Sequence, residues 1–439
     1  MKSKVLKLLA TGVMAVALAA SFGAFTTFAE TVKASGNLDG DVIGWKYYAD
    51  KDKTQEITDE EYWEDPYNSN YTSEKVIEKS CKWTLYNSGR LDITLNSGYK
   101  SGTIADFSKV TDVPWYQYRS SVTSVNVAEG VTSIGKWTFG SLENCKSATL
   151  PSTIDTIPVS CFSGSGLTTF TMPQNIKKIA LYAFKGCTSL SSVTFDENLT
   201  EIDTNAFENS GLVNLDFTSG ITTIGNNAFL GCTELKSVNI PNIESFGVYV
   251  FSGCTSLETV TFDEGITALQ DSTFFGCTSL KSIALPENLK TIGNGTFNSS
   301  GLEYIILPES LEYIGYSAFA STDLEAVYLQ SPISTLTEGT FSNENNIINF
   351  YVERTSELKN VIYPYIRGIE KDNGARFSVK DLGDIDGNSS WNDMDISHAL
   401  RYVTTAESDD IVDKYALDMN LDGNRDMVDV IALYNYIRQ

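Results

Sequence analysis

A phenylalanine returns at a nearly constant interval through the middle of this chain, and this interval constrains the fold more than any other feature. Successive members of the series lie 22 or 23 residues apart. They are Phe139, Phe162, Phe184, Phe207, Phe229, Phe251, Phe274, Phe297, Phe319 and Phe341. Such a period is typical of a solenoid, in which one coil cannot bury its own apolar residues and must stack on its neighbours. The series predicts about ten stacked coils of strand and irregular structure.

Each interval repeats the same internal order. After the phenylalanine comes "GCTSL" or a one-residue-shorter segment ending in "NSSGL", and then a strand such as "LKSIAL". In that strand we expect Leu280, Ile283 and Leu285 to point into the core, while Ser282 and Ala284 face outward. Every coil therefore offers one outward strand position, which can be followed along the sheet.

Four of the seven cysteines occupy one column of the repeat, three residues after the phenylalanine. They are Cys187, Cys232, Cys254 and Cys277. An odd number of cysteines does not fit a small domain held together by disulfides. We interpret the column as a ladder of small buried thiols, because free cysteine packs as a small hydrophobic residue. A disulfide or a metal site is the alternative.

The ends of a stacked array need covers, because an uncapped terminal coil would expose its core. Residues 75–121 contain "CKWTLYNSGRLDITL", which predicts a two-stranded ribbon turning at Asn87, Ser88 and Gly89 over the first coil. Residues 353–382 are expected to close the other end and lead into the tail. With these covers, residues 122–352 resemble the BspA-type leucine-rich repeats of bacterial surface proteins. We call residues 122–352 the repeat array.

The N-terminus has the pattern of an export signal. Three lysines are followed by an apolar run and a small-residue exit at Ala29, which predicts a cleaved signal peptide over residues 1–29. An uncleaved anchor helix is the alternative, although polar residues and glycines interrupt the run. Residues 30–74 are rich in acids, with 11 against 4 lysines over residues 31–74, and read as a solvated linker or irregular extension. We therefore expect a secreted, extracellular protein with no membrane span after cleavage.

Two segments near the C-terminus have the spacing of calcium loops. Oxygen-bearing side chains stand at positions 1, 3, 5, 7, 9 and 12 of each, the pattern that wraps a hard cation. The predicted ligands of the first loop are Asp384, Asp386, Asn388, Ser390, Asn392 and Asp395. Those of the second loop are Asp418, Asn420, Asp422, Asn424, Asp426 and Asp429. Two loops at a fixed offset predict two Ca²⁺ ions.

An apolar helix follows each loop, and the segments "ISHALRYV" and "VIALYNYI" align with each other. This duplicated arrangement over residues 383–439, which we call the tail module, resembles the dockerin of cellulosome-type systems. The resemblance implies a small all-α module that binds a cohesin on a scaffoldin, with two alternative contact faces. The cohesin-binding residues that it implies are Asp393, Met394, Leu400, Met427, Val428 and Leu433. We expect the module to be free to dock.

The outward strand position changes character in the last third of the repeat array, from polar to apolar and aromatic. We call the residues concerned the tyrosine face, which comprises Tyr304, Ile306, Tyr328, Ile348 and Tyr351. An exposed face of this kind commonly marks a partner surface, here for a protein or a glycan. The alternative is that the closing segment, which contains Tyr363 and Tyr365, folds over it.

The net charge and the single histidine limit the classes of function that this chain can have. A formal charge of −24 opposes binding to nucleic acid, whose phosphates require clustered Lys and Arg, and favours divalent cations. The single histidine, His398, is expected on a helix surface, and no nucleophile or phosphate-loop motif is present. We expect a non-catalytic subunit of a cellulosome-like, polysaccharide-degrading complex at the cell surface or free of it. An enzyme with an unrecognised carboxylate site and a structural spacer are the alternatives.

Overall fold

The protein is described as a computed structural model that covers most of the repeat array and parts of both flanks. The described residues are 30–38, 42–48, 56–57, 72–77, 79–330, 335–336, 339–342, 347–352, 376–385, 392–405, 413–419, 425 and 427–437. The predicted signal peptide, residues 1–29, lies outside them. The chain forms two compact units, Met1–Leu199 and Thr200–Gln439. The described array has about nine coils rather than about ten, because the coil around Phe341 is described only in part.

The first unit begins with a sheet that contains the predicted ribbon. Strands β5 (Cys81–Tyr86) and β6 (Arg90–Leu95) pair antiparallel, and the turn between them places Gly89 at φ 90°. A Cβ there would lie 2.6 Å from the Ser121 carbonyl oxygen, so the turn requires glycine. Strand β6 then pairs parallel with the first coil strand, β8 (Ser124–Val127), which pairs with β10 (Ser147–Thr149).

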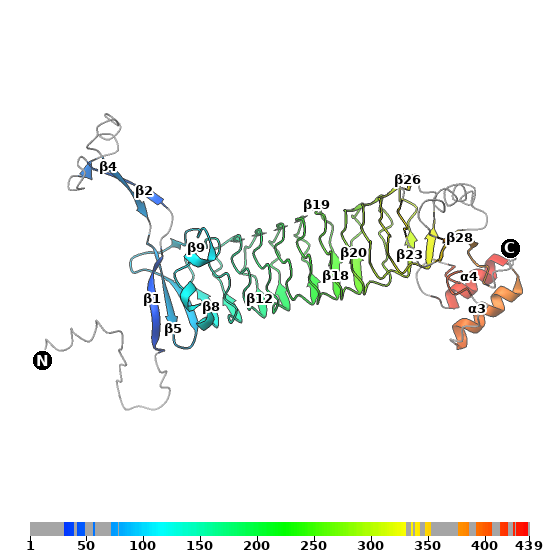
Figure 1. The fold of residues 1–439 in the computed structure, drawn as a ribbon, viewed down its shortest axis with the longest axis horizontal. Helices are drawn as coiled ribbons and strands as arrows, with labels where there is room; N and C mark the ends of the chain where they lie inside the picture. The colour runs from blue at the N-terminus through cyan, green and yellow to red at the C-terminus, as the bar shows by residue number, and fades with distance from the viewer. Residues whose placement is uncertain are drawn as a thin grey trace, which may run out of the picture. The chain divides into compact units, whose positions relative to one another are not determined.

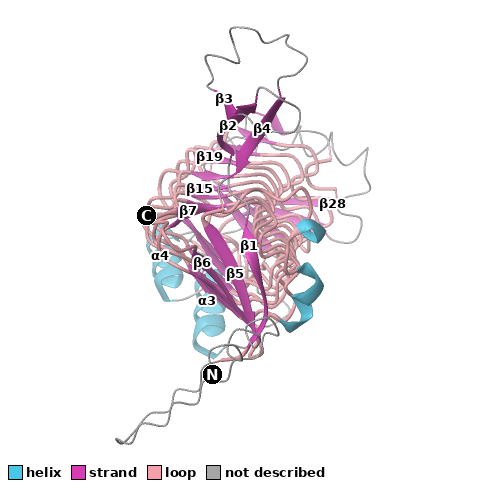
Figure 2. Cartoon of the chain, turned by 90° about the vertical axis from the view of Figure 1, so that its left-hand side faces the viewer, coloured by secondary structure: helices cyan, strands magenta, loops and turns pink. Residues whose placement is uncertain are grey.

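The interpretation of residues 30–74 as irregular is wrong for several segments. Strand β1 (Val32–Leu38) pairs antiparallel with β5, so main-chain hydrogen bonds rather than apolar periodicity recruit it to the sheet. Figure 2 shows β1, β5 and β6 side by side. Strands β2 (Val42–Tyr48), β3 (Glu56–Ile57) and β4 (Thr72–Ile77) form a second, antiparallel sheet.

The core under the ribbon is aromatic. Trp83 and Trp115 are buried with ring centroids 5.9 Å apart, and Trp115 stacks on Phe139 at 6.0 Å. The short helices η1 (Val110–Asp112) and η2 (Tyr116–Ser121) flank Trp115 in the sequence. The ribbon with Trp83, together with Trp115, therefore covers the side chain of Phe139, the first ring of the column, as a cap must.

The remaining strands of the first unit form parallel pairs between successive coils. They are β7 (Gly102–Thr103) with β9 (Val131–Ser133), β11 (Thr156–Ile157) with β13 (Lys178–Ile179), and β12 (Thr169–Thr171) with β14 (Ser192–Thr194).

The second unit continues the same pattern and adds two helices (Figure 1). One group of parallel strands comprises β15 (Glu201–Ile202), β17 (Thr223–Ile224) and β19 (Ser245–Phe246). A second comprises β16 (Asn214–Asp216), β18 (Ser237–Ile240) and β20 (Thr259–Phe262). A third comprises β21 (Ala268–Leu269), β22 (Thr291–Ile292), β24 (Tyr313–Ile314) and β26 (Thr335–Leu336).

The last sheet of the second unit carries the tyrosine face. It consists of β23 (Tyr304–Leu307), β25 (Ala326–Leu329), β27 (Ile347–Val352) and β28 (Arg376–Asp381), all parallel. The tail module follows with helices α3 (Asp393–Thr405) and α4 (Met427–Ile437). No helix among the described residues is long and apolar enough to cross a membrane.

The phenylalanines of the period form a stacked column at the centre of the coils. In the first unit Phe139, Phe162 and Phe184 stack with centroids 5.4 and 5.3 Å apart. In the second unit the column runs from Phe207 to Phe341 with neighbouring centroids 5.2 to 5.9 Å apart. Offset aromatic stacking at this distance adds to the area that each ring buries. One period of 22 or 23 residues in the sequence therefore forms one coil, and the spacing between stacked rings is the rise from one coil to the next.

The cysteine column is a ladder of buried free thiols, as predicted. All seven cysteines are unpaired by disulfides and buried. Each thiol of the column donates to the phenylalanine carbonyl of the preceding coil, for example Cys232 to Phe207 at 3.2 Å and Cys277 to Phe251 at 3.3 Å. Burial raises the pKa of the Cys187 thiol to about 11, although a hydrogen bond with Ser165 opposes the shift. These thiols stay protonated at neutral pH.

Replacing one ring of the column should destabilise the array strongly. Phe274 is fully buried between Phe251 and Phe297, so Phe274→Ala should lower the free energy of unfolding by about 3–5 kcal/mol. The adjacent Phe275 is 40% exposed and offers a matched control. Denaturant unfolding followed by circular dichroism measures both variants. Equal losses for Phe274→Ala and Phe275→Ala would contradict the role of the stack.

The thiols should be inert until the protein unfolds. Alkylation requires the thiolate, and burial in the folded coils both blocks access and keeps the thiols protonated. At pH 8 iodoacetamide should leave the cysteines unmodified in the native protein and modify all of them in denaturant, as measured by mass spectrometry. Rapid modification of Cys187 or Cys232 in the native protein would contradict the buried ladder.

Candidate functional site

Some of the predicted calcium ligands lie in the described residues and others do not. Those described are Asp384, Asn392, Asp395, Asp418 and Asp429. Those outside are Asp386, Asn388, Ser390, Asn420, Asp422, Asn424 and Asp426. The described set includes the first and last positions of both loops. These positions frame each loop and connect it to the helix that follows.

The end of the first loop is held by a reciprocal helix cap. The Asn392 side chain accepts a hydrogen bond from the Met394 amide at 2.8 Å, while Asp395 Oδ2 accepts from the Asn392 amide at 2.9 Å. This is the geometry of a capping box, with a carboxylate in the first turn of α3. The other oxygen, Oδ1, accepts from the Ile385 amide at 2.8 Å and so ties the loop end to its beginning.

The four framing carboxylates are all buried. Asp395 and Asp418 are fully buried, Asp429 is 1% exposed and Asp384 is 8% exposed. Buried carboxylates are costly unless they are compensated, and coordination of a cation is one means of compensation. Asp395 accepts hydrogen bonds from two amides, and carboxylate oxygens are also common ligands of hard cations. This donor set of oxygen atoms fits a hard divalent cation.

The described residues do not complete either metal site. Within them, no three or more His, Cys, Asp or Glu side chains converge in a way that could hold a metal ion. Most ligand positions of both loops fall outside the described residues, so the calcium assignment remains a prediction carried by spacing and by the framing carboxylates.

The two loops are joined to each other at their starting segments. The Gly383 amide donates to the Ala416 carbonyl at 2.8 Å, and the Asp413 amide donates to the Ile385 carbonyl at 2.7 Å. Gly383 has φ 89°, and a Cβ there would lie 3.0 Å from Met419 Sδ. The pairing brings Leu382, Ile385 and Leu417 together as the base of the module.

Some of the residues predicted to contact a cohesin are exposed, and one is buried. Met394, Leu400 and Met427 are 54, 42 and 43% exposed, while the side chains of Asp393 and Val428 lie outside the described ones. Leu433 was wrongly placed on this face, because it is fully buried with Val430, one helical turn away, in the module core. Ile431, 53% exposed, is the apolar residue of α4 that the sequence analysis missed.

The tyrosine face is not exposed, and the prediction that it is a free partner surface is wrong. Tyr328 and Tyr351 are each 1% exposed and Ile348 is fully buried. Tyr304 and Ile306 are partly buried and pack against the same cluster. The described cover is the tail module, which contacts the array through this cluster, while its docking on a cohesin stays a prediction. The closing segment with Tyr363 and Tyr365 lies outside the described residues.

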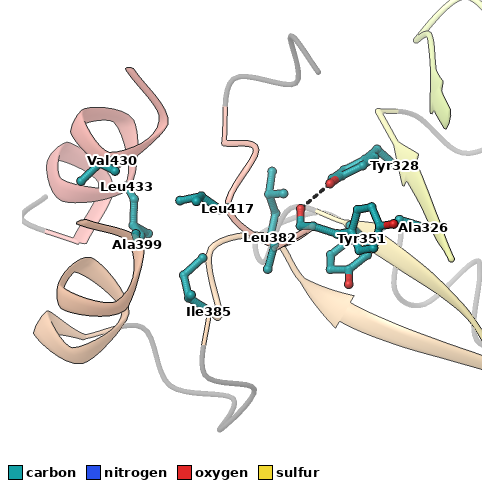
Figure 3. Close-up of a cluster of buried hydrophobic side chains, with 11 residues drawn as sticks. Ala326, Tyr328, Tyr351, Leu382, Ile385, Ala399, Leu417, Val430 and Leu433 are labelled. Atoms are coloured by element: carbon teal, nitrogen blue, oxygen red, sulfur yellow. Dashed lines mark hydrogen bonds between the residues drawn. The ribbon is translucent and has the colours of Figure 1, made fainter. Parts of the chain in front are cut away.

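Figure 3 shows the apolar part of this contact. Leu382, which directly precedes the tail module, and Leu417 of the module lie between the helical residues Val430 and Leu433 and the tyrosines of the array. Tyr328 and Tyr351 stack on each other with centroids 5.2 Å apart. The module and the last array strands therefore share one hydrophobic cluster rather than two separate cores.

Buried hydroxyls and charges fix the orientation of the module on the array. The Tyr351 hydroxyl donates to the carboxylate of Asp413 at 2.7 and 2.8 Å, and the Tyr328 hydroxyl donates to the Tyr415 carbonyl. In the opposite direction, the Tyr415 hydroxyl donates to Glu325 Oε2 at 2.8 Å. Burial, and then the Asp413 carboxylate, raise the pKa of Tyr351, so this phenol stays a donor across the physiological range.

Arg425 links the second loop directly to the array. It stands between the seventh and ninth loop positions, and its guanidinium carbon lies 5.1 Å from the Tyr304 ring centroid and 4.9 Å from that of Tyr415. Cation–π contacts of this kind are strongest when they are partly desolvated. Lys414 adds a weaker, exposed ion pair with Glu325 at 3.8 Å.

Sequence reasoning missed the module side of this contact. The sequence analysis singled out none of the residues Glu325, Asp413, Tyr415 and Arg425 that make this contact. None of them follows a period or a ligand spacing. The one available signal was the aromatic character of Tyr328 and Tyr351 at positions that are polar in earlier coils, which indicated a partner but not which one.

The Phe-centred coils and their parallel strands define a β-solenoid repeat protein. The sequence profile described as BspA type Leucine rich repeat region matches residues 114–236 and 222–348, in 6 copies. The chain belongs to this family, as the resemblance of residues 122–352 predicted. A search of curated proteins found no match to the chain.

Several solved structures are similar to this chain. A leucine-rich repeat protein from Bacteroides ovatus ATCC 8483 shares 26% identity over 59% of this chain and 66% of its own, slightly under two thirds, with a TM-score of 0.49. One from Eubacterium ventriosum ATCC 27560 shares 18% identity over 70 and 84%, with a TM-score of 0.39. The pneumococcal vaccine antigen PcpA shares 16% identity over 69 and 98%, with a TM-score of 0.36.

Removing an aromatic ring from the tyrosine face should destabilise the protein. Because Tyr328 is buried under the tail module, Tyr328→Ala should open a cavity and cost about 3 kcal/mol of folding free energy. Tyr316→Ala is the control, since Tyr316 is 61% exposed. Calorimetric melting of both variants measures the difference. A Tyr328→Ala protein that melts like the Tyr316→Ala control would show that the ring is not part of the core.

Proposed function

We propose that this chain is a secreted, non-catalytic binding protein whose tail module is a calcium-dependent dockerin. The module would attach the repeat array to a scaffoldin cohesin in a cellulosome-like, polysaccharide-degrading complex, at the cell surface or free of it. The proposal is carried by one observation. Two segments with the ligand spacing of a calcium loop start 34 residues apart, at Asp384 and Asp418, and both bury their first and last carboxylates.

Two Ca²⁺ ions would be held by side chains of the loops. In the first loop Asp384 and Asp395 would ligate the ion, with Asp386, Asn388, Ser390 and Asn392 completing the set by spacing. In the second loop Asp418 and Asp429 would do the same, with Asn420, Asp422, Asn424 and Asp426. The cation would neutralise carboxylates that otherwise repel one another, and so favour the closed loop.

The cohesin would contact exposed apolar side chains at the beginnings and middles of the two helices. Met394 and Leu400 on α3 and Met427 and Ile431 on α4 are all more than two-fifths exposed. Methionine and isoleucine exposed on a small module are the kind of side chains that bury well in an interface. The duplicated loop-and-helix pattern supports two alternative contact faces.

The repeat array would carry a second partner, a protein or a glycan. Since the tail module covers the tyrosine face, we place this partner on the outward positions of the polar strands. Thr171 and Thr194 are exposed in the first unit, and Asp216 and Thr261 are exposed in the second. In each unit these positions offer hydroxyl or carboxylate groups suited to hydrogen bonding with a polar ligand. The N-terminal signal pattern supports an extracellular location for both interactions.

Titration of the full chain against a panel of cohesins tests the proposal. We expect one or more cohesins to bind in calcium and to be released by a chelator. Met394→Ala and Met427→Ala should each weaken binding only slightly if either face suffices, whereas the double variant should weaken it by at least about tenfold. Tyr316→Ala, an exposed change on the array, is the control.

Two results would count against parts of this function. If no cohesin of the panel binds in the presence of calcium, the dockerin assignment fails. If Met427→Ala alone abolishes binding, one face is responsible and the dual mode is wrong. Isothermal titration calorimetry distinguishes these cases because it reports affinity and stoichiometry together.

A further inference from the structure

The segments of the tail module that contact the array are the segments that begin its calcium loops. Leu382 and Ile385 lie on either side of Asp384, the first ligand position of loop one. Tyr415, Ala416 and Leu417 directly precede Asp418, the first position of loop two, and all belong to the shared cluster. The backbone that must be in place to bind a cation is therefore the backbone that docks on the array.

Arg425 provides a second connection between the loop and the array. It lies within loop two, yet its guanidinium contacts the rings of Tyr304 on the array and Tyr415 on the module. Arg425 is the eighth position in the twelve-residue spacing of loop two, so the predicted calcium loop and the contact with the array share this residue.

The described core of the module is shared with the array. Among residues 383–439, the described members of the cluster are Ile385, Ala399, Tyr415, Ala416, Leu417, Val430 and Leu433. Domains of this size usually need a metal or a partner in addition to their core. Burying the four framing carboxylates is costly, and coordination of a cation would offset part of that cost. Cation binding would therefore stabilise the docked module, and docking would stabilise the cation-bound loops.

We propose that the tail module is a calcium-linked cap of the repeat array, so that cation binding in its loops and docking on Tyr328 and Tyr351 stabilise each other. The inference rests on the calcium binding proposed above and goes beyond cohesin recognition. In calcium the module covers the tyrosine face and closes the last coils. Without calcium the module detaches and the last strands lose their cover.

Linkage makes this proposal testable from the array side. If calcium binding makes docking on the array more favourable, then docking must make calcium binding more favourable by the same free energy. A substitution that weakens docking should therefore lower the affinity for calcium. Tyr351→Phe removes the hydroxyl that donates to Asp413 and keeps the buried ring. Tyr351 is not a predicted calcium ligand, and Asp413 lies before loop two. Hydrogen bonds to a charged acceptor are among the stronger ones, so the expected loss is on the order of tenfold in calcium affinity.

The experiment uses the full chain, with the metal itself as the probe. Calorimetric titration with Ca²⁺ should show affinity weakened about tenfold in Tyr351→Phe and unchanged in Tyr316→Phe, whose ring is 61% exposed. Hydrogen exchange measured by mass spectrometry supplies an independent readout. A chelator should accelerate exchange in the strands Ala326–Leu329 and Ile347–Val352, and leave the strand Ser237–Ile240 unchanged.

The outcomes separate this inference from the proposed function. Equal calcium affinities for Tyr351→Phe and wild type overturn the linkage even if cohesin still binds. Unchanged exchange of the last strands after chelation overturns it as well. A wild-type chain that binds no calcium overturns both the proposed function and the inference.

Discussion

Each coil of this protein depends on the aromatic ring of the coil before and the coil after it. Neighbouring rings of the second unit are 5.2 to 5.9 Å apart, and every phenylalanine of the column from Phe139 to Phe319 is fully buried. Each coil is therefore stabilised mainly by its contacts with neighbouring coils. The terminal coils, which have a neighbour on one side only, are the least stable part of the array.

The two ends are closed by different means. At the start, a ribbon continues the sheet through main-chain hydrogen bonds, and Trp83 and Trp115 cover the first ring. On the last sheet, side chains of a separate module meet side chains of the array, with Tyr328 and Tyr351 at the centre. Strand pairing tolerates many sequences, whereas a side-chain contact requires particular residues on both partners. The second closure can therefore respond to the state of the module.

Features with a local period could be predicted from the sequence. The Phe column, the thiol ladder and the ribbon at Gly89 each follow from spacing or turn chemistry, and the structure has all of them. Features that depend on distant contacts could not. Tyr351 contacts Asp413, which lies 62 residues further along the chain, and Val32–Leu38 joins the ribbon by antiparallel backbone pairing with Cys81–Tyr86. Leu433 was misplaced because two apolar faces of a short helix look alike until the core is located.

The shared cluster at Tyr328, Leu382 and Leu417 has a mechanical consequence. A module on a flexible tether lets its cargo search a large volume, but transmits no orientation. Here the exposed helix positions Met394 and Met427 belong to the same packed body as the last coils. A protein that bound those helices would thereby hold the last coils at a set angle, and a force on the array would reach that protein through the tyrosine contact as well as along the chain.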